Sequence, residues 1–390
     1  MRRESRNDNR RQRRLLEEAA CCGVASFNDS FQSLADEAYE TPHDSHNFLC
    51  ARFSREEIEV GKKLGSGSYS DVYEVKSFKL NNKFMHTMTA EEVKKRREMA
   101  QRPECYAMKH LKPSLMNTNT DILQDAAFDI SYEAEMLMNL DHPNILKIEG
   151  IHHEKQAAFK HGCDSFFLIL ERLDDSLHKR ISNWSKQLSR RIPLKKLTKS
   201  NGATMPTLCE RLGMASSIAS ALRYLHSKRI IYRDLKPENC GVDTQGNIKL
   251  FDFGLSRVLP SSKHSKYDSL YDMSGAGTPR YCAPEVLKSQ PYNESVDVYA
   301  FSIVLHELLS LKRPYKGYTT KQAFVEAVLG GERPCVENKE WPVVVKEAMR
   351  AAFSEQLSRR PNLDEFIDAL GSSSCILSTK SRRQTTARAA

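Results

Sequence analysis

The chain has 390 residues, of which 40% are hydrophobic and 28% charged, a composition that suits a folded protein with a sizeable core. No apolar run reaches the roughly 18–20 residues of a membrane-spanning helix, so a membrane span is excluded. The arginine-rich first residues lack the apolar segment of a secretion signal. We therefore expect a cytoplasmic protein, with nuclear import through residues 10–14 as the alternative.

The net charge of +9 is concentrated in three segments. Residues 1–14 hold seven arginines against two acidic residues, and further basic residues gather at 180–199 and 380–388. Such runs are usually solvated, so we do not expect nucleic acid as a partner. The ten cysteines include no Cys-x-x-Cys pair, which indicates free thiols in a reducing compartment.

The first half of the chain reads as an extension followed by strands. Residues 1–57 are polar and lack sustained periodicity, so we expect a mostly disordered extension with a short helix near residues 15–20, and order beginning near Ile58. The next segments predict two strands around a Gly/Ser turn at 58–77 and an inserted helix or loop at 78–102. Further strands are predicted at 106–109, 146–151 and 166–171. Apolar spacing predicts a helix at 121–140, which ends before Pro143.

The second half reads as helices. Residues 180–205 are basic and rich in Ser and Lys, which suggests a second insert, and apolar spacing predicts long helices at 208–225 and 295–311. Residues 371–390 are expected to form a flexible tail. Strands before about residue 172 and helices after it predict an α+β fold of two lobes, with a cleft between them as the natural small-molecule site.

Several short segments have compositions that suit phosphate chemistry. Gly65 and Gly67 follow a predicted strand, and glycine lets a phosphate approach the backbone closely. Lys109 lies on the next predicted strand. Its ammonium group needs a carboxylate partner, for which Glu133 and Glu135 on the following helix compete. Further along, residues 231–239 read Ile-Tyr-Arg-Asp-Leu-Lys-Pro-Glu-Asn and residues 252–254 read Asp-Phe-Gly.

These segments occur in an order that resembles a eukaryotic protein kinase domain, from about Ile58 to Leu370. The resemblance includes Ala-Met-Lys at 107–109, Ala-Pro-Glu at 283–285 and Arg-Arg-Pro at 359–361. It implies a mainly β N-lobe at 58–171, a helical C-lobe at 174–370, and ATP between them. It also implies two structural contacts, an ion pair of Glu285 with Arg360 and a hold of Asp297 on the catalytic-loop backbone.

The resemblance assigns roles to the polar residues of the motifs. Asp234 would be the catalytic base, Lys236 would meet the γ-phosphate, and Asn239 and Asp252 would bind Mg²⁺. Lys109 would contact the α- and β-phosphates of ATP. Its partner would be Glu133 rather than Glu135, because the family places this glutamate four residues before an apolar position.

The resemblance also assigns the nucleotide-binding surface. Leu64, Gly65, Gly67, Val72 and Ala107 would lie against ATP from the N-lobe. Leu170 would be the gatekeeper, and Glu171 to Leu173 the hinge that binds adenine. Two departures stand out: Tyr232 replaces the usual histidine, and Gly241 falls where a Leu-like side chain normally touches the underside of adenine, which puts nucleotide affinity in question.

Lys236 and Thr278 together favour Ser/Thr specificity, and the Asp-Val-Tyr-Ala-Phe run at 297–301 resembles the tyrosine-kinase-like group. The expected partners are a protein with a Ser/Thr acceptor and an upstream kinase acting on residues 255–278, since Arg233 beside the base is typical of control by phosphorylation. Two alternatives stay open: a pseudokinase that acts as a nucleotide-binding scaffold, suggested by Gly241 and the inserts, and a small-molecule kinase of related fold.

Overall fold

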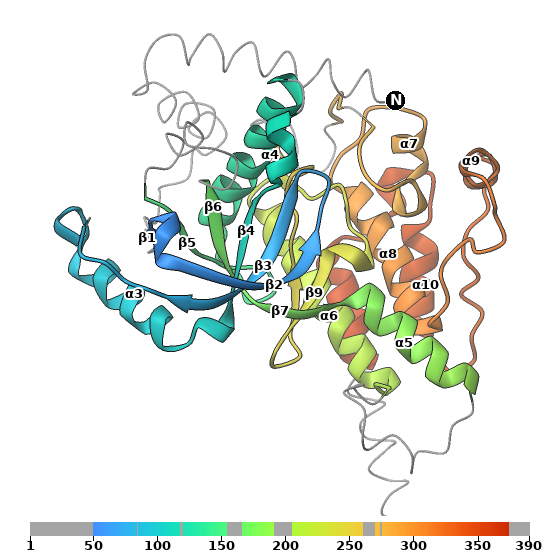
Figure 1. Cartoon of the computed structure of the whole chain (residues 1–390). Coiled ribbons are helices and arrows are strands. Elements are labelled where there is room, and N and C mark those ends of the chain that lie inside the picture. The colour runs from blue at the N-terminus through green and yellow to red at the C-terminus, as the bar shows by residue number, and fades with distance from the viewer. Residues whose placement is uncertain are drawn as a thin grey trace, which may run out of the picture. The chain divides into compact units, whose positions relative to one another are not determined.

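The computed structural model describes residues 50–83, 85–117, 120–153, 166–190, 205–259, 270–273 and 275–373. These residues form two compact units (Figure 1). The β unit comprises the described residues up to 175 together with 241–254. The helical unit comprises the described residues of 176–240 and 255–373. The first unit is mainly sheet and the second mainly helix, so the α+β class expected from the sequence is confirmed.

A six-stranded sheet forms the body of the β unit. Its strand order is β1-β5-β6-β4-β3-β2, and the pairing is antiparallel except for the parallel pair of β1 and β5. The strands are β1 (Ala51–Phe53), β2 (Ile58–Ser66), β3 (Ser70–Phe78), β4 (Tyr106–Leu111), β5 (Ile148–His152) and β6 (Phe167–Glu171). Helix α4 (Thr120–Met138) packs against β4 and β5, and α3 (Ala90–Gln101) against β1 and β3.

Regular structure begins earlier in the chain than expected, with β1 and the 3-10 turn at Arg55–Glu57. The prediction of a disordered extension over residues 1–57 is therefore wrong for residues 51–57. Phe53 of β1 is fully buried in a cluster with Ile58, Val75 and Met99. Its sheet partner β5 lies about a hundred residues away, which is why local periodicity could not indicate β1. Residues 1–49, including a short helix suggested near residues 15–20, lie outside the described residues.

The predicted insert at 78–102 contains helix α3, and ion pairs connect this helix to β1 and to the turn that follows β1. The buried side chains of Arg96 and Glu57 form an ion pair, and Arg52 Nε lies 2.8 Å from Glu92 Oε1. Thr89 caps the helix, since its side chain accepts a hydrogen bond from the Glu92 backbone N–H. The insert therefore belongs to the core of the β unit.

A second, three-stranded sheet of order β10-β9-β7 completes the β unit, except for residues 176 and 240, which fall in the helical unit. Its strands are β7 (Leu173–Ser176), β9 (Cys240–Asp243) and β10 (Ile248–Leu250). The first sheet is joined to it within the unit, because the Leu146 N–H donates to the Leu250 carbonyl at 2.8 Å. This arrangement sets β9 against β7.

The helical unit is built around α8 (Ser295–Ser310), in which the positions from Val296 to Leu309 are buried. Helices α6 (Leu208–Ser227) and α10 (Val343–Ala352) contact α8. The other described helices of this unit are α5 (Leu177–Arg190), α7 (Pro284–Leu287), α9 (Lys321–Leu329) and a helix at 363–373. Its short strands are β8 (Ile230–Ile231) and β11 (Arg257–Val258). Short 3-10 turns of both units lie at Arg55–Glu57, Met85–Thr87, Pro103–Cys105, Pro113–Asn117, Pro237–Asn239, Pro279–Tyr281 and Leu357–Arg359.

Two predicted boundaries are wrong in this unit. Residues 180–190, assigned to an insert, belong to α5, because Leu177, Ile181 and Trp184 bury one face at helical spacing. Residues 371–373, assigned to the tail, extend the last helix and include the buried Ser373. Residues 191–204 and 374–390 lie outside the described residues.

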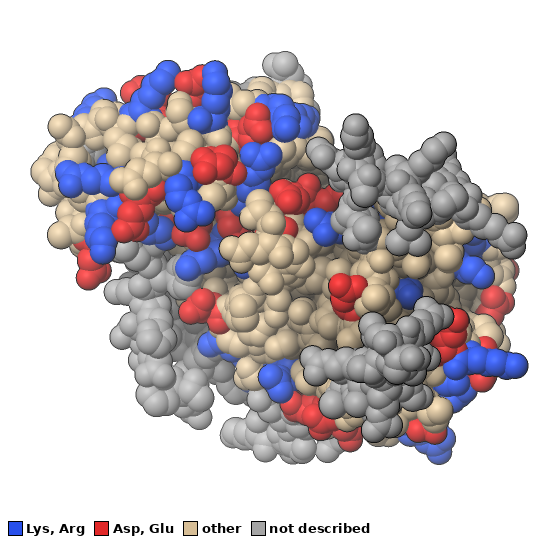
Figure 2. Space-filling model, turned by 90° about the horizontal axis from the view of Figure 1, so that it is seen from below, with Lys and Arg blue, Asp and Glu red and all other residues tan. Residues whose placement is uncertain are grey.

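The surface of the described residues carries both signs of charge. On the face drawn in Figure 2, Lys and Arg side chains alternate with Asp and Glu. None of the described helices is long and apolar enough to cross a bilayer.

Candidate functional site

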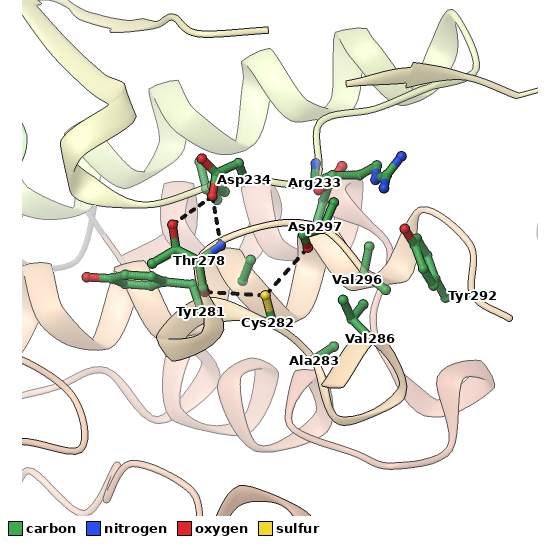
Figure 3. A pocket seen from close by; sticks show the side chains of 13 residues that line it. Arg233, Asp234, Thr278, Tyr281, Cys282, Ala283, Val286, Tyr292, Val296 and Asp297 are labelled. Atoms are coloured by element: carbon green, nitrogen blue, oxygen red, sulfur yellow. Dashed lines mark hydrogen bonds between the residues drawn. The ribbon is translucent and has the colours of Figure 1, made fainter. Parts of the chain in front are cut away.

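The carboxylate of Asp234 is the centre of a hydrogen-bond network in the helical unit. Its Oδ1 accepts hydrogen bonds from the backbone N–H and the hydroxyl of Thr278, each at 2.9 Å. Its Oδ2 accepts from Lys236 Nζ at 2.5 Å and from Asn239 Nδ2 at 3.0 Å. Figure 3 shows the Thr278 side chain pointing toward this carboxylate. Four donors therefore fix both oxygens of one nearly buried acid.

The segment that carries Asp234 is held by α8. Asp297, near the start of that helix, accepts hydrogen bonds from the backbone N–H groups of Tyr232 and Arg233 at 2.8 and 2.9 Å. His226 Nε2 lies 2.9 Å from the same carboxylate. Arg233 has a φ of 71°, a left-handed conformation that costs a non-glycine residue about 1–2 kcal/mol. The contacts of Asp297 keep the backbone in this conformation, and the expected contact of Asp297 with the backbone before Asp234 is confirmed.

Asn239 is oriented by Asp234 in a way that suits a cation ligand. Its Nδ2 donates to both the carbonyl and the carboxylate of Asp234, each at 3.0 Å. Because the amide nitrogen is used in this way, the amide oxygen faces elsewhere and keeps its lone pairs. An amide oxygen is a ligand that Mg²⁺ accepts.

Lys236 and Thr278 contact one another as well as Asp234, since Lys236 Nζ donates to Thr278 Oγ1 at 3.0 Å. The three side chains thus form a closed triangle. Thr278 follows Gly277, whose φ is 109° and whose Cβ, if it had one, would lie 2.5 Å from the Arg233 carbonyl oxygen. Only glycine permits this close approach, which brings the Thr278 segment against the Asp234 segment.

A small cavity of about 10 Å³ lies beneath this triangle, lined by Asp234, Thr278, Cys282 and Asp297 among others (Figure 3). It has room for about one water molecule. The Cys282 thiol donates to the Thr278 carbonyl at 3.3 Å, and burial raises its pKa to about 12. A thiol with so high a pKa is a poor nucleophile, so Cys282 serves packing here.

In the β unit, Lys109 forms an ion pair with Glu133, which settles the choice between Glu133 and Glu135. Burial opposes the charge of Lys109, but the carboxylates of Glu133 and Asp252 outweigh it and raise the pKa of the ammonium group. Asp252 has a φ of 66°, the same left-handed strain as Arg233. Strained non-glycine residues gather at functional sites, and here one precedes Asp234 and the other is Asp252 itself.

The glycine-rich turn joins β2 to β3. The Gly67 N–H donates to the Ser70 carbonyl at 2.8 Å, and Lys112 Nζ donates to the Gly67 carbonyl at 2.5 Å. A Cβ placed on Gly65 would meet nothing within 4 Å, so the backbone there borders open space. Sequence reasoning missed Lys112, because a lysine just after a strand resembles any surface lysine.

The remaining nucleotide-surface candidates lie around β4, β6 and β7. Register pairs Ala107 with Leu170 and Val72 with Lys109. The Glu171 side chain is already engaged, since it accepts from the Lys147 N–H at 2.8 Å and pairs with Lys249. Both carboxylate oxygens of Glu171 thus have partners within the β unit, and its backbone N–H donates to the Lys147 carbonyl at 3.0 Å. Leu64 lies half-buried on β2, and Leu173 begins β7.

The structural pair expected from the sequence is present. Arg360 donates to both oxygens of Glu285, at 2.6 and 2.8 Å, and both residues are buried. Sequence reasoning missed another buried contact, in which the Tyr281 hydroxyl donates to Glu307 at 2.8 Å. It also missed His226 as a partner of Asp297. Neither has a sequence signal beyond its place on a buried helix face.

The motif residues thus fall into two sets, each assembled within its own unit. Asp234, Lys236, Asn239 and Thr278 meet in the helical unit, and Lys109 and Glu133 pair in the β unit near Asp252. Among the described residues, no group of three or more His, Cys, Asp or Glu side chains could hold a metal ion.

Comparison with known proteins gives a family and several relatives. The model of the protein kinase domain matches residues 95–370. The chain is 27% identical to the cAMP-dependent protein kinase type 3 of Saccharomyces cerevisiae over 81% of its length and 64% of that protein. It is 28% identical to the serine/threonine-protein kinase STY46 of Arabidopsis thaliana, over 80% of its length and 44% of the relative. It is 29% identical to the serine/threonine-protein kinase VIK of the same plant, over 68% of its length and 53% of the relative.

The chain therefore covers between 44% and 64% of the length of these three relatives. The segment that matches the family model carries all the motif residues from Lys109 to Arg360.

Proposed function

The chain belongs to the protein kinase family, and from that premise we propose that it is a serine/threonine protein kinase. The reaction is the transfer of the γ-phosphoryl group of ATP to the hydroxyl of a serine or threonine in a protein substrate. Catalysis in this reaction class comes mainly from positioning and from stabilisation of charge.

The observation that carries the proposal is the set of donors on Asp234. All four fix the carboxylate before substrate arrives, which is the preorganisation that a base needs. Since both oxygens are occupied, an incoming hydroxyl must replace one donor. The Thr278 hydroxyl and Lys236 are the two side chains that can rotate away, whereas the Thr278 N–H belongs to the backbone. We propose that the substrate hydroxyl takes the place of one of them, and that Asp234 accepts its proton.

Lys236 then has a second role. Once its hydrogen bond to Asp234 is exchanged, its ammonium group can contact the γ-phosphate and neutralise charge that develops there. Thr278 orients both partners through the contacts described above. The Lys236–Thr278 pair favours Ser/Thr acceptors, and STY46 and VIK are serine/threonine-protein kinases. Assignment to the tyrosine-kinase-like group rests on residues 297–301.

The cofactors of the proposed reaction are ATP and Mg²⁺. Asn239, through its amide oxygen, and Asp252, through its carboxylate, are the proposed metal ligands, and Mg²⁺ commonly completes its shell with waters and phosphate oxygens. Bound Mg²⁺ would neutralise charge on the β- and γ-phosphates. Lys109, oriented by Glu133, is proposed to contact the α- and β-phosphates.

The nucleotide surface is proposed from residues of the β unit. The open space at Gly65 lets phosphates approach the backbone of the turn that Gly67 and Lys112 fix. The proposed contacts of the base and sugar are Leu64, Val72, Ala107, the backbone of Glu171, and Leu173.

A transfer assay tests the function directly. The full chain is incubated with Mg²⁺ and γ-labelled ATP, and a basic protein, a tyrosine-rich peptide and small alcohols are offered as acceptors. We expect label on serine and threonine of the protein alone, and loss of label when Mg²⁺ is chelated. Transfer to small alcohols would indicate a small-molecule kinase. Binding of Mg·ATP without transfer to any acceptor would indicate a pseudokinase.

Control by an upstream kinase is a further part of the proposal. The Tyr271 hydroxyl accepts a hydrogen bond from Arg229 Nη2 at 3.0 Å, and the Tyr271 backbone pairs with Tyr292. A phosphate on Tyr271 would therefore lie beside an arginine, the kind of partner that phosphate oxygens prefer. The serine candidates 261, 262, 265, 269 and 274 lie outside the described residues. Mapping phosphates on active enzyme contradicts this control if residues 255–278 carry none.

The proposed compartment is the cytoplasm, with the nucleus as the alternative. The six cysteines among the described residues for which a state is assigned form no disulfide, which suits a reducing compartment. Imaging of a fluorescently tagged chain distinguishes the two locations.

A further inference from the structure

Gly241 is the residue of the nucleotide surface that departs from the family pattern, and the structure gives a reason for it. A Cβ built on Gly241 would lie 2.3 Å from Leu173 Cδ1, 3.1 Å from Cγ and 3.2 Å from Cδ2. Contacts below 3.0 Å do not occur for real Cβ atoms. The Leu173 side chain therefore occupies the volume that a side chain at position 241 would fill.

The need for glycine at position 241 comes from space rather than from backbone conformation. Gly246, Gly277 and Gly331 are the described glycines with positive φ, and Gly241 is not among them. A different residue could adopt the backbone of Gly241 if Leu173 were smaller. Size at position 241 is thus coupled to size at position 173.

The fold fixes this coupling. Leu173 begins β7, Gly241 lies on β9, and the two strands are neighbours in the three-stranded sheet. Both residues belong to the β unit. Leu173 is half-buried, so its side chain covers the glycine and still presents part of its surface outward.

We propose that Leu173 and Gly241 are a size-exchanged pair, in which the leucine of β7 supplies the apolar wall for the purine ring that the glycine of β9 lacks. This inference rests on the proposed function, because it assumes that the base of ATP lies against these strands. It removes the main reason to suspect weak nucleotide binding. It also makes Leu173 a specificity-determining residue for the base rather than for the phosphates.

The chemical reason is burial of apolar surface. A purine ring presents a flat apolar face, and each carbon of leucine that this face covers adds to affinity. Truncation of Leu173 to alanine removes the three carbons that now fill the space over Gly241. Restoring a leucine at position 241 in that background would return apolar carbons to the same volume from the other strand.

The test is direct binding measured by titration calorimetry on the full chain, with Mg·ADP as the ligand and magnesium tripolyphosphate as the ligand without a base. We expect Leu173→Ala to weaken Mg·ADP about tenfold, which corresponds to about 1.4 kcal/mol. Binding of tripolyphosphate should not change. Gly241→Leu should weaken Mg·ADP at least as much, because two leucines cannot share the volume. The double variant Leu173→Ala/Gly241→Leu should recover to within about threefold of the native chain.

Controls distinguish a loss of the Leu173 contact from misfolding of a variant and from failure of the proposed function. Leu80→Ala truncates an exposed leucine of the same unit and should leave Mg·ADP binding unchanged. Melting of each variant without ligand detects misfolding, and Gly241→Ala replaces Gly241→Leu if the latter does not fold. Failure of the native chain to bind Mg·ADP would overturn the proposed function itself.

Three results would overturn the inference alone. One is native Mg·ADP affinity in Leu173→Ala. Another is a double variant that binds no better than Leu173→Ala, which would mean that position 241 does not share the wall. The third is an equal loss for Mg·ADP and tripolyphosphate, since it would show a general disturbance of the site.

Discussion

Replacement of Asp297 by alanine should destabilise the helical unit by about 3–5 kcal/mol. Asp297 is 1% exposed and accepts hydrogen bonds from the backbone N–H groups of Tyr232 and Arg233 and from His226. The two backbone donors are buried, and a buried donor without an acceptor costs about 1–3 kcal/mol. The side chain of His226 is partly accessible, so water offsets part of its loss.

Intrinsic fluorescence gives a readout confined to this unit. The chain has two tryptophans, Trp184 and Trp341, and both are buried in the helical unit. Urea unfolding followed by tryptophan emission therefore reports the free energy of unfolding of the unit that contains Asp297. Asp364→Ala is a matched control, because it removes an exposed aspartate paired with Arg223 and should cost less than about 1 kcal/mol.

Asp297→Asn sharpens the test. Asparagine keeps one acceptor oxygen but turns an amide donor toward groups that also donate, so it should recover only part of the loss. The transfer rate should fall in both variants while Mg·ATP affinity stays within about threefold, because the proposed phosphate contacts of Lys109 are untouched. A loss of stability below about 1 kcal/mol in Asp297→Ala would refute the reasoning.

Three further predictions concern buried groups. Arg360→Met leaves the buried Glu285 without its partner and should cost about 3–5 kcal/mol in the same urea assay, and Arg360→Met/Glu285→Leu should regain most of it. Burial raises the pKa of Glu307 to about 7, above its ordinary value of 4.5. The folded state then binds the proton more tightly, so stability from this group is present below about pH 4.5 and is lost as pH rises through 7. Between pH 5 and 8 the free energy of unfolding should therefore fall by about 2–3 kcal/mol less in Glu307→Gln than in the native chain, and an equal fall in the two proteins would contradict this. Phe53→Ala should cost the β unit about 3–5 kcal/mol, measured by amide hydrogen exchange of β1 and β5, and unchanged exchange would show that β1 is not part of the core.

The sequence predicted the parts of this protein whose signals are local or carried by motifs. The strands around the glycine-rich turn, α4, α6 and α8 follow from periodicity, and the contacts of Asp297 and of Glu285 follow from the family resemblance. The strand β1 was not predicted, because its partner β5 is far away in the chain and three residues carry no period. Helix α5 was mistaken for an insert, since its charged outer face masked the buried stripe of Leu177, Ile181 and Trp184.

The candidate site shows the same division. Asp234, Asn239 and Lys236 were found through the family resemblance, but the donors that saturate the Asp234 carboxylate are visible only in the structure. Gly241 was seen as a departure without its explanation, because only the neighbouring strand reveals that Leu173 fills its place. Lys112 has no motif at all, and its role at Gly67 depends on the turn geometry.

The most direct test of the central claim compares the native chain with Asp234→Asn. Transfer of the γ-phosphate to a basic protein acceptor is measured in a single turnover, and Mg·ATP affinity is measured separately by calorimetry. If Asp234 is the base, the transfer rate falls by about 10²–10⁴-fold while the affinity for Mg·ATP stays within a few fold. Equal transfer rates in the two proteins would contradict the account.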